Sequence, residues 1–419
     1  MTPTEQPSET VEEFAARARD WLASAMPRLT AEPVHERRDD IWDRQRELQR
    51  MVWDGGFAGI CVPREYGGLG LPFEYQRAYT RESLPYELPF YLGTPTFSII
   101  LATILDFGTD EQKRAHVPGI LRGDTIWVQF LSEPSGGSDL AACLTRVDRR
   151  DDGWVMNGAK IWSSGAEACD FGLVLARTNW DVPKHAGLSV FILDMSAPGV
   201  TVEPITQVNG NHTFCQEFFD DVVLPADALL GGLDDGWTVA TALLTHEREG
   251  VGGSSIYVSG RNILAPGSTL RTNPTAILAR SLGVADDPVA RQLIGEQRMS
   301  DLVQRGLVER ITVGVRAGAL PPPSASLLKL YTAGASVRRT EIASTLAGEL
   351  AVLWPEGDVP SQERADKYLI RQADSISGGT SEIQRNIISE RVLGLPREMA
   401  ADRGVPYREV RQSSRSAGS

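Results

Sequence analysis

Residues 129–142 read QFLSEPSGGSDLAA, a short apolar run followed by a loop rich in Ser, Gly and Pro. Glycines let a backbone approach a ligand closely, and hydroxyl and amide groups can bind the polar edge of a ring or a phosphate. The stretch therefore predicts a ligand-binding turn at the end of a strand, although an ordinary connecting loop has the same composition.

A second segment, residues 157–165, reads NGAKIWSSG and places Trp162 on the following pair of strands. An aromatic side chain beside hydroxyls suits one face of a flat heterocycle. A tryptophan in the protein core is the alternative interpretation of the same residues.

Residues 378–397 read GGTSEIQRNIISERVLGLPR, in which two glycines precede a helix start at Thr380-Ser381. Ser381 and Gln384 predict a capping box there. Free N–H groups at a helix N-terminus favour a phosphate or a developing oxyanion. A glycine-rich loop followed by a normal N-cap would look the same.

Residues 245–249 read THERE within an otherwise apolar helical pattern. A carboxylate in such surroundings can be a general base. Because successive helical residues point about 100° apart, Glu247, Arg248 and Glu249 cannot share one face. A solvated charge cluster is the alternative.

Around these segments the chain reads as helical, then β, then helical. Thr10 and Glu13 predict a capping box before the first helix, and the turn at Asp152-Gly153 predicts a β-hairpin. We expect an N-terminal helical domain at 1–124, a central β domain at 125–235 and a C-terminal helical domain at 236–400, with a frayed polar tail at 401–419 and a loop-rich insertion at 264–287.

Composition narrows the class of protein. The chain has 419 residues, with 42 Lys+Arg against 55 Asp+Glu and a formal net charge of −13, which argues against a nucleic-acid binder. We find no secretory signal and no run of about 18 apolar residues, so no membrane span is expected. Four scattered cysteines favour reduced thiols in a cytoplasmic enzyme, and five histidines without metal-ligand spacing predict no metal site.

In this order, SEPSGGSDLA, NGAKIWSSGA, a helical THERE and GGTSEIQRNIISERVLG resemble the acyl-CoA dehydrogenases, flavoproteins that oxidise acyl-CoA thioesters. The resemblance covers roughly residues 10–398. It implies an α+β fold with an N-terminal all-α domain, a central β-barrel or sandwich and a C-terminal four-helix bundle.

The resemblance also implies FAD as the cofactor, which would supply the hydride chemistry while the protein supplies orientation and electrostatics. Trp162 and Ser164 are expected beside the isoalloxazine ring, and Arg280 at the pyrophosphate. The remaining residues expected at the cofactor are Gln129, Leu131, Ser132, Gly137, Ser138, Thr380 and Glu382.

The implied reaction is α,β-dehydrogenation of an acyl-CoA thioester to the trans-2-enoyl-CoA. The backbone N–H near Gly378 would stabilise the developing enolate oxygen. Many family members place the catalytic Glu directly before G-T-S, where this chain has Gly378. Glu247 matches the position that the isovaleryl-CoA type uses instead, so we predict Glu247 as the base. Arg248, Ser138 and Gly379 are expected at the substrate.

Two segments depart from the family pattern. The R-x-x-x-F-G segment is reduced to Arg280-Ser281-Leu282-Gly283, and the Gln-x-x-Gly-Gly-x-Gly loop is not recognisable in TLAGELAVLWPEGDV (345–359). The resemblance implies an electron-transfer flavoprotein as acceptor and a homo-oligomer, a dimer or tetramer, with a hetero-oligomer also open. Two other functions remain open on this fold: a flavin-dependent monooxygenase or oxidase, and a degenerate, non-catalytic subunit of a heteromeric enzyme. Base placement on the earlier helix favours a branched or bulky acyl chain.

Overall fold

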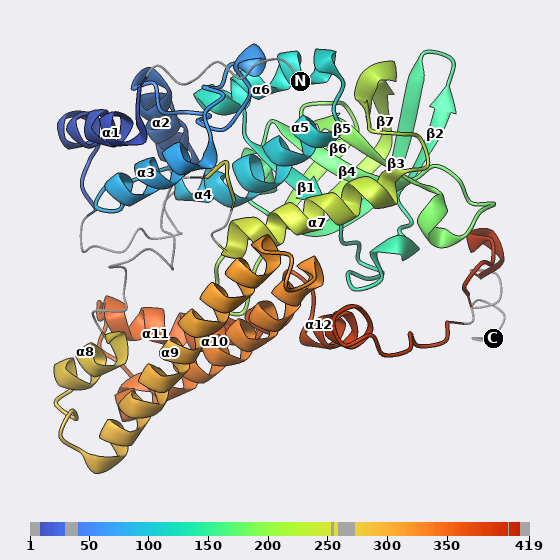
Figure 1. The fold of residues 1–419 in the computed structure, drawn as a ribbon. Helices are drawn as coiled ribbons and strands as arrows, with labels where there is room; N and C mark the ends of the chain where they lie inside the picture. The colour runs from blue at the N-terminus through green and yellow to red at the C-terminus, as the bar shows by residue number, and fades with distance from the viewer. Residues whose placement is uncertain (1–8, 30–40, 253–254, 259–272, 401, 411–419) are drawn as a thin grey trace. The chain divides into compact units, whose positions relative to one another are not determined.

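The structure is a computed structural model, and it describes residues 9–29, 41–252, 255–258, 273–400 and 402–410. The chain forms two compact units, drawn in Figure 1. The first unit comprises residues 1–207, 211–262 and 400–419, and the second comprises 208–210 and 263–399. Each unit is described by itself.

The first unit begins with helices. Thr10 caps α1 (Val11–Ala25) by the predicted capping box: its hydroxyl accepts from the Glu13 amide, and the Glu13 carboxylate accepts from the Thr10 amide. The apolar face of α1 packs on α3 and on the loop that follows α2, around Phe14, Leu22 and Phe57. The other helices here are α2 (Ile41–Asp54), α3 (Phe73–Ser83) and α6 (Asp110–Arg122).

A long apolar helical run follows α3. It consists of α4 (Phe90–Leu92), the π-helix η2 (Gly93–Leu101) and α5 (Ala102–Phe107). The 18 residues from Phe90 to Phe107 have a mean hydropathy of 1.4 and are long enough to cross a membrane, but 61% of the window is buried inside the protein. The sequence pattern did not predict an apolar helix of this length, because Gly, Thr and Pro interrupt its beginning. Burial of this extent is what the core helix of a globular protein shows.

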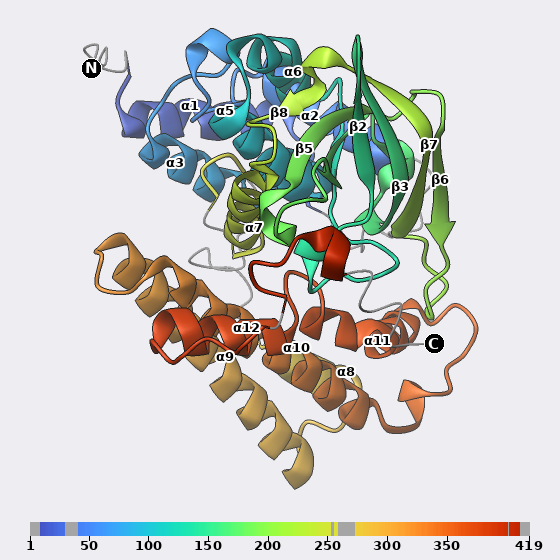
Figure 2. The ribbon, with the colours of Figure 1, turned by 90° about the vertical axis from the view of Figure 1, so that its right-hand side faces the viewer.

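The central part of the first unit is one sheet. Its strands follow the order β6-β7-β3-β2-β4-β5-β8, and β1 pairs in parallel with β4. Figure 2 shows β2, β3, β7 and β6 side by side in this sheet. The bounds are β1 (Trp127–Phe130), β2 (Arg146–Arg150), β3 (Gly153–Ser164), β4 (Phe171–Arg177), β5 (Leu188–Asp194), β6 (Val200–Ile205), β7 (Phe214–Pro225) and β8 (Leu229–Leu230). The predicted hairpin joins β2 to β3, with Arg150 opposite Gly153 and the turn at Asp151-Asp152.

Both faces of the middle strands are buried. Along β4, Leu173 and Leu175 belong to a core shared with the helices, whereas Val174 and Ala176 belong to a core formed by the sheet itself. Strands covered on both faces lose the alternation of polar and apolar residues, which is why β4 reads as a continuous apolar run. The sheet is therefore a layer between two cores.

Helix α7 (Gly236–Gly252) packs against η2 and β5 and buries Val239, Ala240 and Leu243 in the core shared with the helices. Figure 1 shows it running along the sheet. By packing it belongs to the first unit, although the sequence pattern groups it with the helices that follow.

The second unit is helical. Its elements are α8 (Pro274–Ser281), α9 (Pro288–Arg316), α10 (Ala325–Ala347), α11 (Val359–Ile370), α12 (Ser381–Ile387) and the π-helix η10 (Ile388–Val392). Helix α8 lies inside the segment predicted as a loop-rich insertion, whose residues 264–272 are outside the described part of the chain. The helix bundle rests on α10, which packs against α8, α9, α11 and α12.

The C-terminal segment 402–410 returns to the first unit. The Tyr407 amide donates to the Val182 carbonyl at 2.9 Å, and the Tyr407 hydroxyl donates to the Ala142 carbonyl at 2.7 Å. The Tyr407 ring stacks on Trp180, and its centroid lies 4.1 Å from the guanidinium carbon of Arg177. The predicted frayed tail therefore does not describe residues 402–410, because Tyr407 is buried against the sheet domain; residues 411–419 lie outside the described part.

Candidate active site

The loop that follows β1 is a tight turn. The Glu133 amide donates to the Gly136 carbonyl at 3.1 Å, and the Gly136 amide donates back to the Glu133 carbonyl at 2.9 Å. A Cβ atom at Gly137 would lie 3.1 Å from the Ser132 hydroxyl oxygen, so a side chain there would crowd Ser132. The turn therefore brings Ser132 and Gly137 together, two of the residues that the sequence predicts at the ligand.

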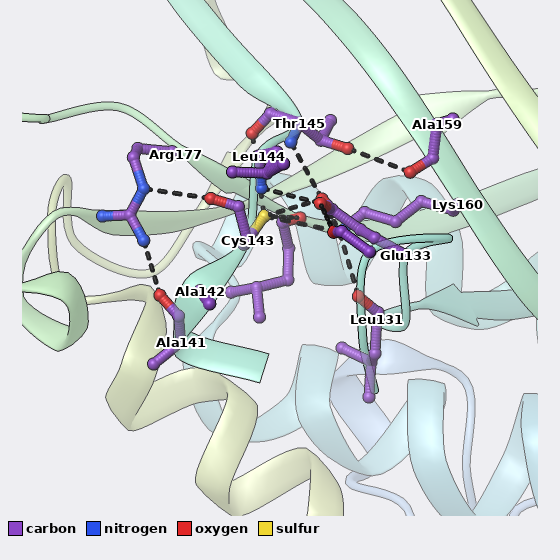
Figure 3. A network of polar contacts seen from close by, with 12 residues as sticks. Leu131, Glu133, Ala141, Ala142, Cys143, Leu144, Thr145, Ala159, Lys160 and Arg177 are labelled. Carbon is purple, nitrogen blue, oxygen red and sulfur yellow. Dashed lines mark hydrogen bonds and ion pairs between the residues drawn. The ribbon is translucent and has the colours of Figure 1, made fainter. Parts of the chain in front are cut away.

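The Glu133 carboxylate lies in a network of polar contacts with Cys143, Leu144 and Thr145, as Figure 3 shows. It accepts from the Thr145 amide at 2.8 Å, from the Leu144 amide at 2.7 Å and from the Cys143 thiol at 3.0 Å. These bonds attach the loop to the chain that leads into β2. The first residue of the turn, Glu133, thus anchors it to residues 143–145 through a buried carboxylate.

Lys160 on β3 completes this buried network. Its ammonium lies 3.0 Å from the Glu133 carboxylate and donates to the Leu131 carbonyl, also at 3.0 Å. Burial would raise the pKa of Glu133, but the Lys160 charge, the two amides and the thiol outweigh it and lower that pKa to about 2. The ion pair therefore joins the end of β1 to β3, and the Ile161 amide adds a 3.0 Å bond to the Ser132 carbonyl.

Trp162 and Ser164 occupy the end of β3. The pairing of β3 with β7 shifts register between Ile161 and Ser163, and Trp162 adopts a left-handed backbone with φ of 69°. Trp162 is 56% exposed, an unusual fraction for so large an apolar side chain, and Ser164 is also exposed. A strained residue that holds an aromatic ring in the open is the pattern expected at a ligand site.

Gln129 adds an unsatisfied group. Its Oε1 atom is buried and has no hydrogen-bond partner among the described residues. Buried side-chain oxygens are almost always paired, so this atom calls for a donor that the described protein does not supply. Gln129 lies on β1, two residues before Leu131, so the unsatisfied oxygen is close to the loop in sequence.

Glu247 and Arg248 lie near the C-terminal end of α7. Glu247 is half-buried, and Arg248 donates to the Thr245 hydroxyl at 2.9 Å. The neighbouring His246 fixes this turn to the helical core: its Nε2 lies 2.8 Å from the Asp106 carboxylate, and its Nδ1 lies 3.6 Å from Glu249. Burial lowers the pKa of His246, but the two carboxylates outweigh it and raise that pKa. His246 and Glu249 therefore share a face that Glu247 does not.

The other predicted residues lie in the second unit. Gly378 and Gly379 have φ of 62° and 89°, and their carbonyls both accept from the Gln384 side-chain amide. The N-cap of α12 is Thr380, whose hydroxyl accepts from the Ile383 amide at 3.2 Å. The predicted capping box of Ser381 and Gln384 is therefore wrong: the chain is still extended at Thr380, so Ser381 is already helical and Gln384 bonds the glycine carbonyls instead.

Arg280 and Glu382 are both exposed. Arg280 donates to the Ala276 carbonyl of its own helix at 3.1 Å, and Glu382 lies 3.8 Å from Arg385. The predicted site residues are thus divided between the two units. The first unit contains 129–138, Trp162, Ser164, Glu247 and Arg248, and the second contains Arg280, Gly378, Gly379, Thr380 and Glu382.

A pocket open to solvent lies among the helices of the first unit. Its walls include Tyr79, Phe97 and Tyr257, the last of which follows α7. The Tyr79 hydroxyl is buried and has no partner among the described residues, and burial raises its pKa. The pocket lining is mixed, because Gln49 and Gln76 stand beside these aromatic residues.

Sequence reasoning quoted Glu133 and Lys160 within their segments but assigned them no role, and it did not consider Ser163 or Glu217. The Glu133–Lys160 pair joins residues 27 positions apart, and only the packing of β1 on β3 reveals it. One signal was present: a lysine between apolar residues of a predicted strand needs a buried partner.

Comparison with known proteins identifies the class. The sequence model for "Acyl-CoA dehydrogenase, N-terminal domain" matches residues 8–124, the middle-domain model matches 129–222 and the C-terminal-domain model matches 234–393. The chain belongs to the acyl-CoA dehydrogenase family, whose members are oxidoreductases and flavoproteins. The predicted family and the predicted fold are both confirmed.

Individual relatives cover nearly the whole chain. Acyl-CoA dehydrogenase IpdE1 of Mycobacterium tuberculosis is 33% identical over 93% of this chain and 99% of its own. The solved Tcur3481-Tcur3483 steroid ACAD has a TM-score of 0.73 at 27% identity over 94% of this chain and 99% of its own. The ChsE4-ChsE5 complex of Mycobacterium tuberculosis has a TM-score of 0.70 at 25% identity over 95% of this chain and the full length of its own.

The first unit fits a flavin on its own observations. The unpaired buried Oε1 of Gln129 requires a donor, as a ring N–H would provide. The exposed Trp162 offers an aromatic face, and Ser132 and Gly137 lie within a turn too tight for a further side chain. A flat heterocycle with polar edges meets all three conditions.

Proposed function

We propose that this chain is an FAD-dependent dehydrogenase that converts an acyl-CoA thioester to its trans-2-enoyl-CoA, with Glu247 as the base. The observation that carries the proposal is a half-buried carboxylate on α7, in a chain that has Gly378 where many family members place the base. Bound FAD would supply the acceptor for the β-hydride. Glu247 would take the α-proton.

The remaining predicted residues take the roles that their positions support. The family resemblance implies that the flavin would be held by Gln129, Leu131, Ser132, Gly137, Ser138, Trp162 and Ser164, and that Thr380, Glu382 and Arg280 would also contact the cofactor. The amide near Gly378 would stabilise the enolate oxygen, because preorganised donors lower the cost of developing charge. Arg248, Ser138 and Gly379 would hold the thioester and its CoA moiety.

For the substrate, we propose a bulky acyl group of the steroid type. Support comes from a relative described as a steroid ACAD.

For its partners, we propose an electron-transfer flavoprotein as the acceptor and an oligomeric state. One relative was solved as a complex of two chains. This supports assembly with a second, related chain as the alternative to a homo-oligomer. FAD bound per chain, measured on the protein purified alone, separates these possibilities: full occupancy supports a self-sufficient oligomer, and absent flavin supports a partner chain.

The test is anaerobic bleaching of the bound flavin by a panel of short, long, branched and steroid-like acyl-CoA thioesters. Bleaching by the steroid-like thioester, and a faster rate than with short chains, supports the proposal. Consumption of oxygen during turnover would favour the monooxygenase or oxidase alternative. If none of the thioesters bleaches the flavin, the proposed dehydrogenase reaction is contradicted.

A further inference from the structure

Strand β3 changes the side on which its residues point shortly before its end. Lys160 is fully buried, Ile161 is half-buried, Trp162 is exposed, Ser163 is buried and Ser164 is exposed. Strict alternation from Lys160 would bury Trp162 and Ser164 and expose Ser163. The register shift between Ile161 and Ser163 supplies the extra residue that reverses this phase.

The side chain of Ser163 bonds to a buried carboxyl on the neighbouring strand. Its hydroxyl forms a short hydrogen bond with the Oε1 atom of Glu217 on β7, directly behind the shifted register. Glu217 is fully buried, and its second oxygen, Oε2, has no partner among the described residues. A buried carboxyl that is only half satisfied is costly to keep, so a benefit elsewhere is expected.

The surroundings of Glu217 contain few groups that could pair with it. Lys160 is opposite it on β3, but its ammonium is bound to Glu133 and the Leu131 carbonyl. Cys215 is on the same strand, and its thiol donates to Glu167 of η4 (Ala166–Ala168) at 2.7 Å. The residue opposite Glu217 on β6 is the apolar Val202.

These neighbours decide the charge of the Glu217 carboxyl. Burial raises the pKa of Glu217, the Ser163 bond and Lys160 lower it, Glu167 raises it, and the result is about 7. The carboxyl therefore carries a proton in a large fraction of molecules at neutral pH, which reduces the cost of burying it.

We propose that Glu217 is a positioning residue for the flavin site: by anchoring Ser163 it fixes the β-bulge that turns Trp162 and Ser164 outward. This inference rests on the proposed function, because it assigns the outward face of that bulge to the flavin. Without the anchor, Ser163 loses its buried partner, and β3 can return to the alternation that buries Trp162. The binding face for the flavin would then lose an aromatic ring and a hydroxyl together.

The experiment compares the affinity of the apoprotein for FAD among five proteins. They are the unmodified chain, Ser163→Ala, Glu217→Val, Glu217→Gln and the control Glu203→Val, which removes an exposed glutamate from the neighbouring strand β6. Titration with FAD, followed by quenching of flavin fluorescence, gives Kd. The visible absorption spectrum of the bound flavin reports its surroundings independently of turnover.

We expect Ser163→Ala and Glu217→Val to weaken FAD binding about tenfold and to shift the visible spectrum, and Glu217→Gln to stay within about threefold because the amide still bonds Ser163. The control should match the unmodified chain. Ser163→Ala removes one hydroxyl and retains the fold, so it decides the question if Glu217→Val does not fold.

Unchanged Kd and spectrum in both Ser163→Ala and Glu217→Val would overturn the inference. Loss of affinity to the same degree in Glu203→Val would also overturn it, because the effect would then be general to the sheet. If the unmodified chain binds FAD but no thioester bleaches it, the proposed reaction fails while the ranking of affinities still tests the bulge. A chain with no affinity for FAD would overturn both.

Discussion

The Lys160 ammonium lies 3.0 Å from the Glu133 carboxylate, and neither side chain reaches solvent. Such a pair is stable only when each charge keeps its partner, because removing one partner leaves the other buried and uncompensated. Lys160 also donates to the Leu131 carbonyl, and Glu133 accepts from the amides of Leu144 and Thr145, so breaking the pair would loosen the loop at 131–138.

Lys160→Met should therefore destabilise the protein by about 3–5 kcal/mol and loosen the loop at 131–138. The measurement is urea unfolding followed by tryptophan fluorescence, with limited proteolysis to locate the loosened segment. Arg146→Met on the exposed part of β2 is the matched control and should change stability by under about 1 kcal/mol. Equal effects of the two substitutions would contradict a special role for the buried pair.

Glu247→Gln should retain FAD and slow anaerobic bleaching by acyl-CoA about 10²–10⁴-fold, because a neutral amide cannot take the α-proton. Stopped-flow absorbance of the bound flavin gives the rate. Glu249→Gln, two residues further along α7, is the control and should bleach at close to the unmodified rate. A Glu247→Gln protein that bleaches as fast as this control would remove Glu247 from the reaction.

Stability should depend on the charge of Glu217. Its pKa is raised by burial from 4.5 to about 7, so the folded protein binds a proton that the unfolded chain releases between these values. The contribution of Glu217 to stability is therefore fully present below about pH 4.5 and is lost as the pH rises through about 7. At about pH 8.5, Glu217→Gln should be more stable than the unmodified chain by up to about 3 kcal/mol.

Near pH 4.5 the unmodified protein and Glu217→Gln should differ little in stability. Urea midpoints measured across this range test the sign. A stability difference that does not change with pH would show that Glu217 is neutral throughout.

The ion pair between His246 on α7 and Asp106 predicts that the stability of the protein depends on pH. The pKa of His246 is raised above its usual value, so its contribution to stability is present below about pH 6.5 and is lost as the pH rises through the raised value. Asp106→Asn should remove this contribution, worth under about 1 kcal/mol for a partly solvated pair. NMR titration of the His246 ring would report the pKa directly, and an unchanged value in Asp106→Asn would contradict the pairing.

Tyr407 covers a buried cation. Arg177 is fully buried, and its guanidinium donates to the carbonyls of Ala141 at 2.6 Å and Cys143 at 3.1 Å. Tyr407→Ala should destabilise the first unit by about 2 kcal/mol or more, because the desolvated cation loses its aromatic face. Tyr407→Phe keeps the ring and should cost about 1 kcal/mol for the lost hydroxyl bond. Thermal unfolding gives the stability of both variants. If Tyr407→Ala and Tyr407→Phe were equally stable, the contact between the Tyr407 ring and Arg177 would be contradicted.

Much of the fold could be predicted because local patterns and tertiary packing agree. The capping box at Thr10 and the hairpin between β2 and β3 follow from neighbouring residues alone. The tail could not be predicted: its composition is polar, and only the distant Arg177 and Trp180 give Tyr407 a place to pack.

The candidate active site shows the same difference between what local sequence predicts and what tertiary packing determines. Trp162 and Ser164 could be singled out by residue type, whereas the bulge that exposes them depends on β7, more than 50 residues further on. Ser381 was predicted one residue too late as the N-cap, because Thr380 and Ser381 are equally good caps and only the backbone decides between them. Residue types thus identified the candidate ligand-binding residues, and tertiary packing determined which of their side chains are exposed.

The return of residues 402–410 to the first unit bears on how the protein is synthesised. Chains emerge from the ribosome N-terminus first, and domains tend to fold as units in that order. Here the first unit lacks Tyr407 until the whole of the second unit has been translated, so during that time Arg177 has the Trp180 ring but not the closer Tyr407 ring. Residues 402–410, which are translated after the second unit, thus complete packing in the unit that is made first, and a chain terminated before Tyr407 would lack that contact.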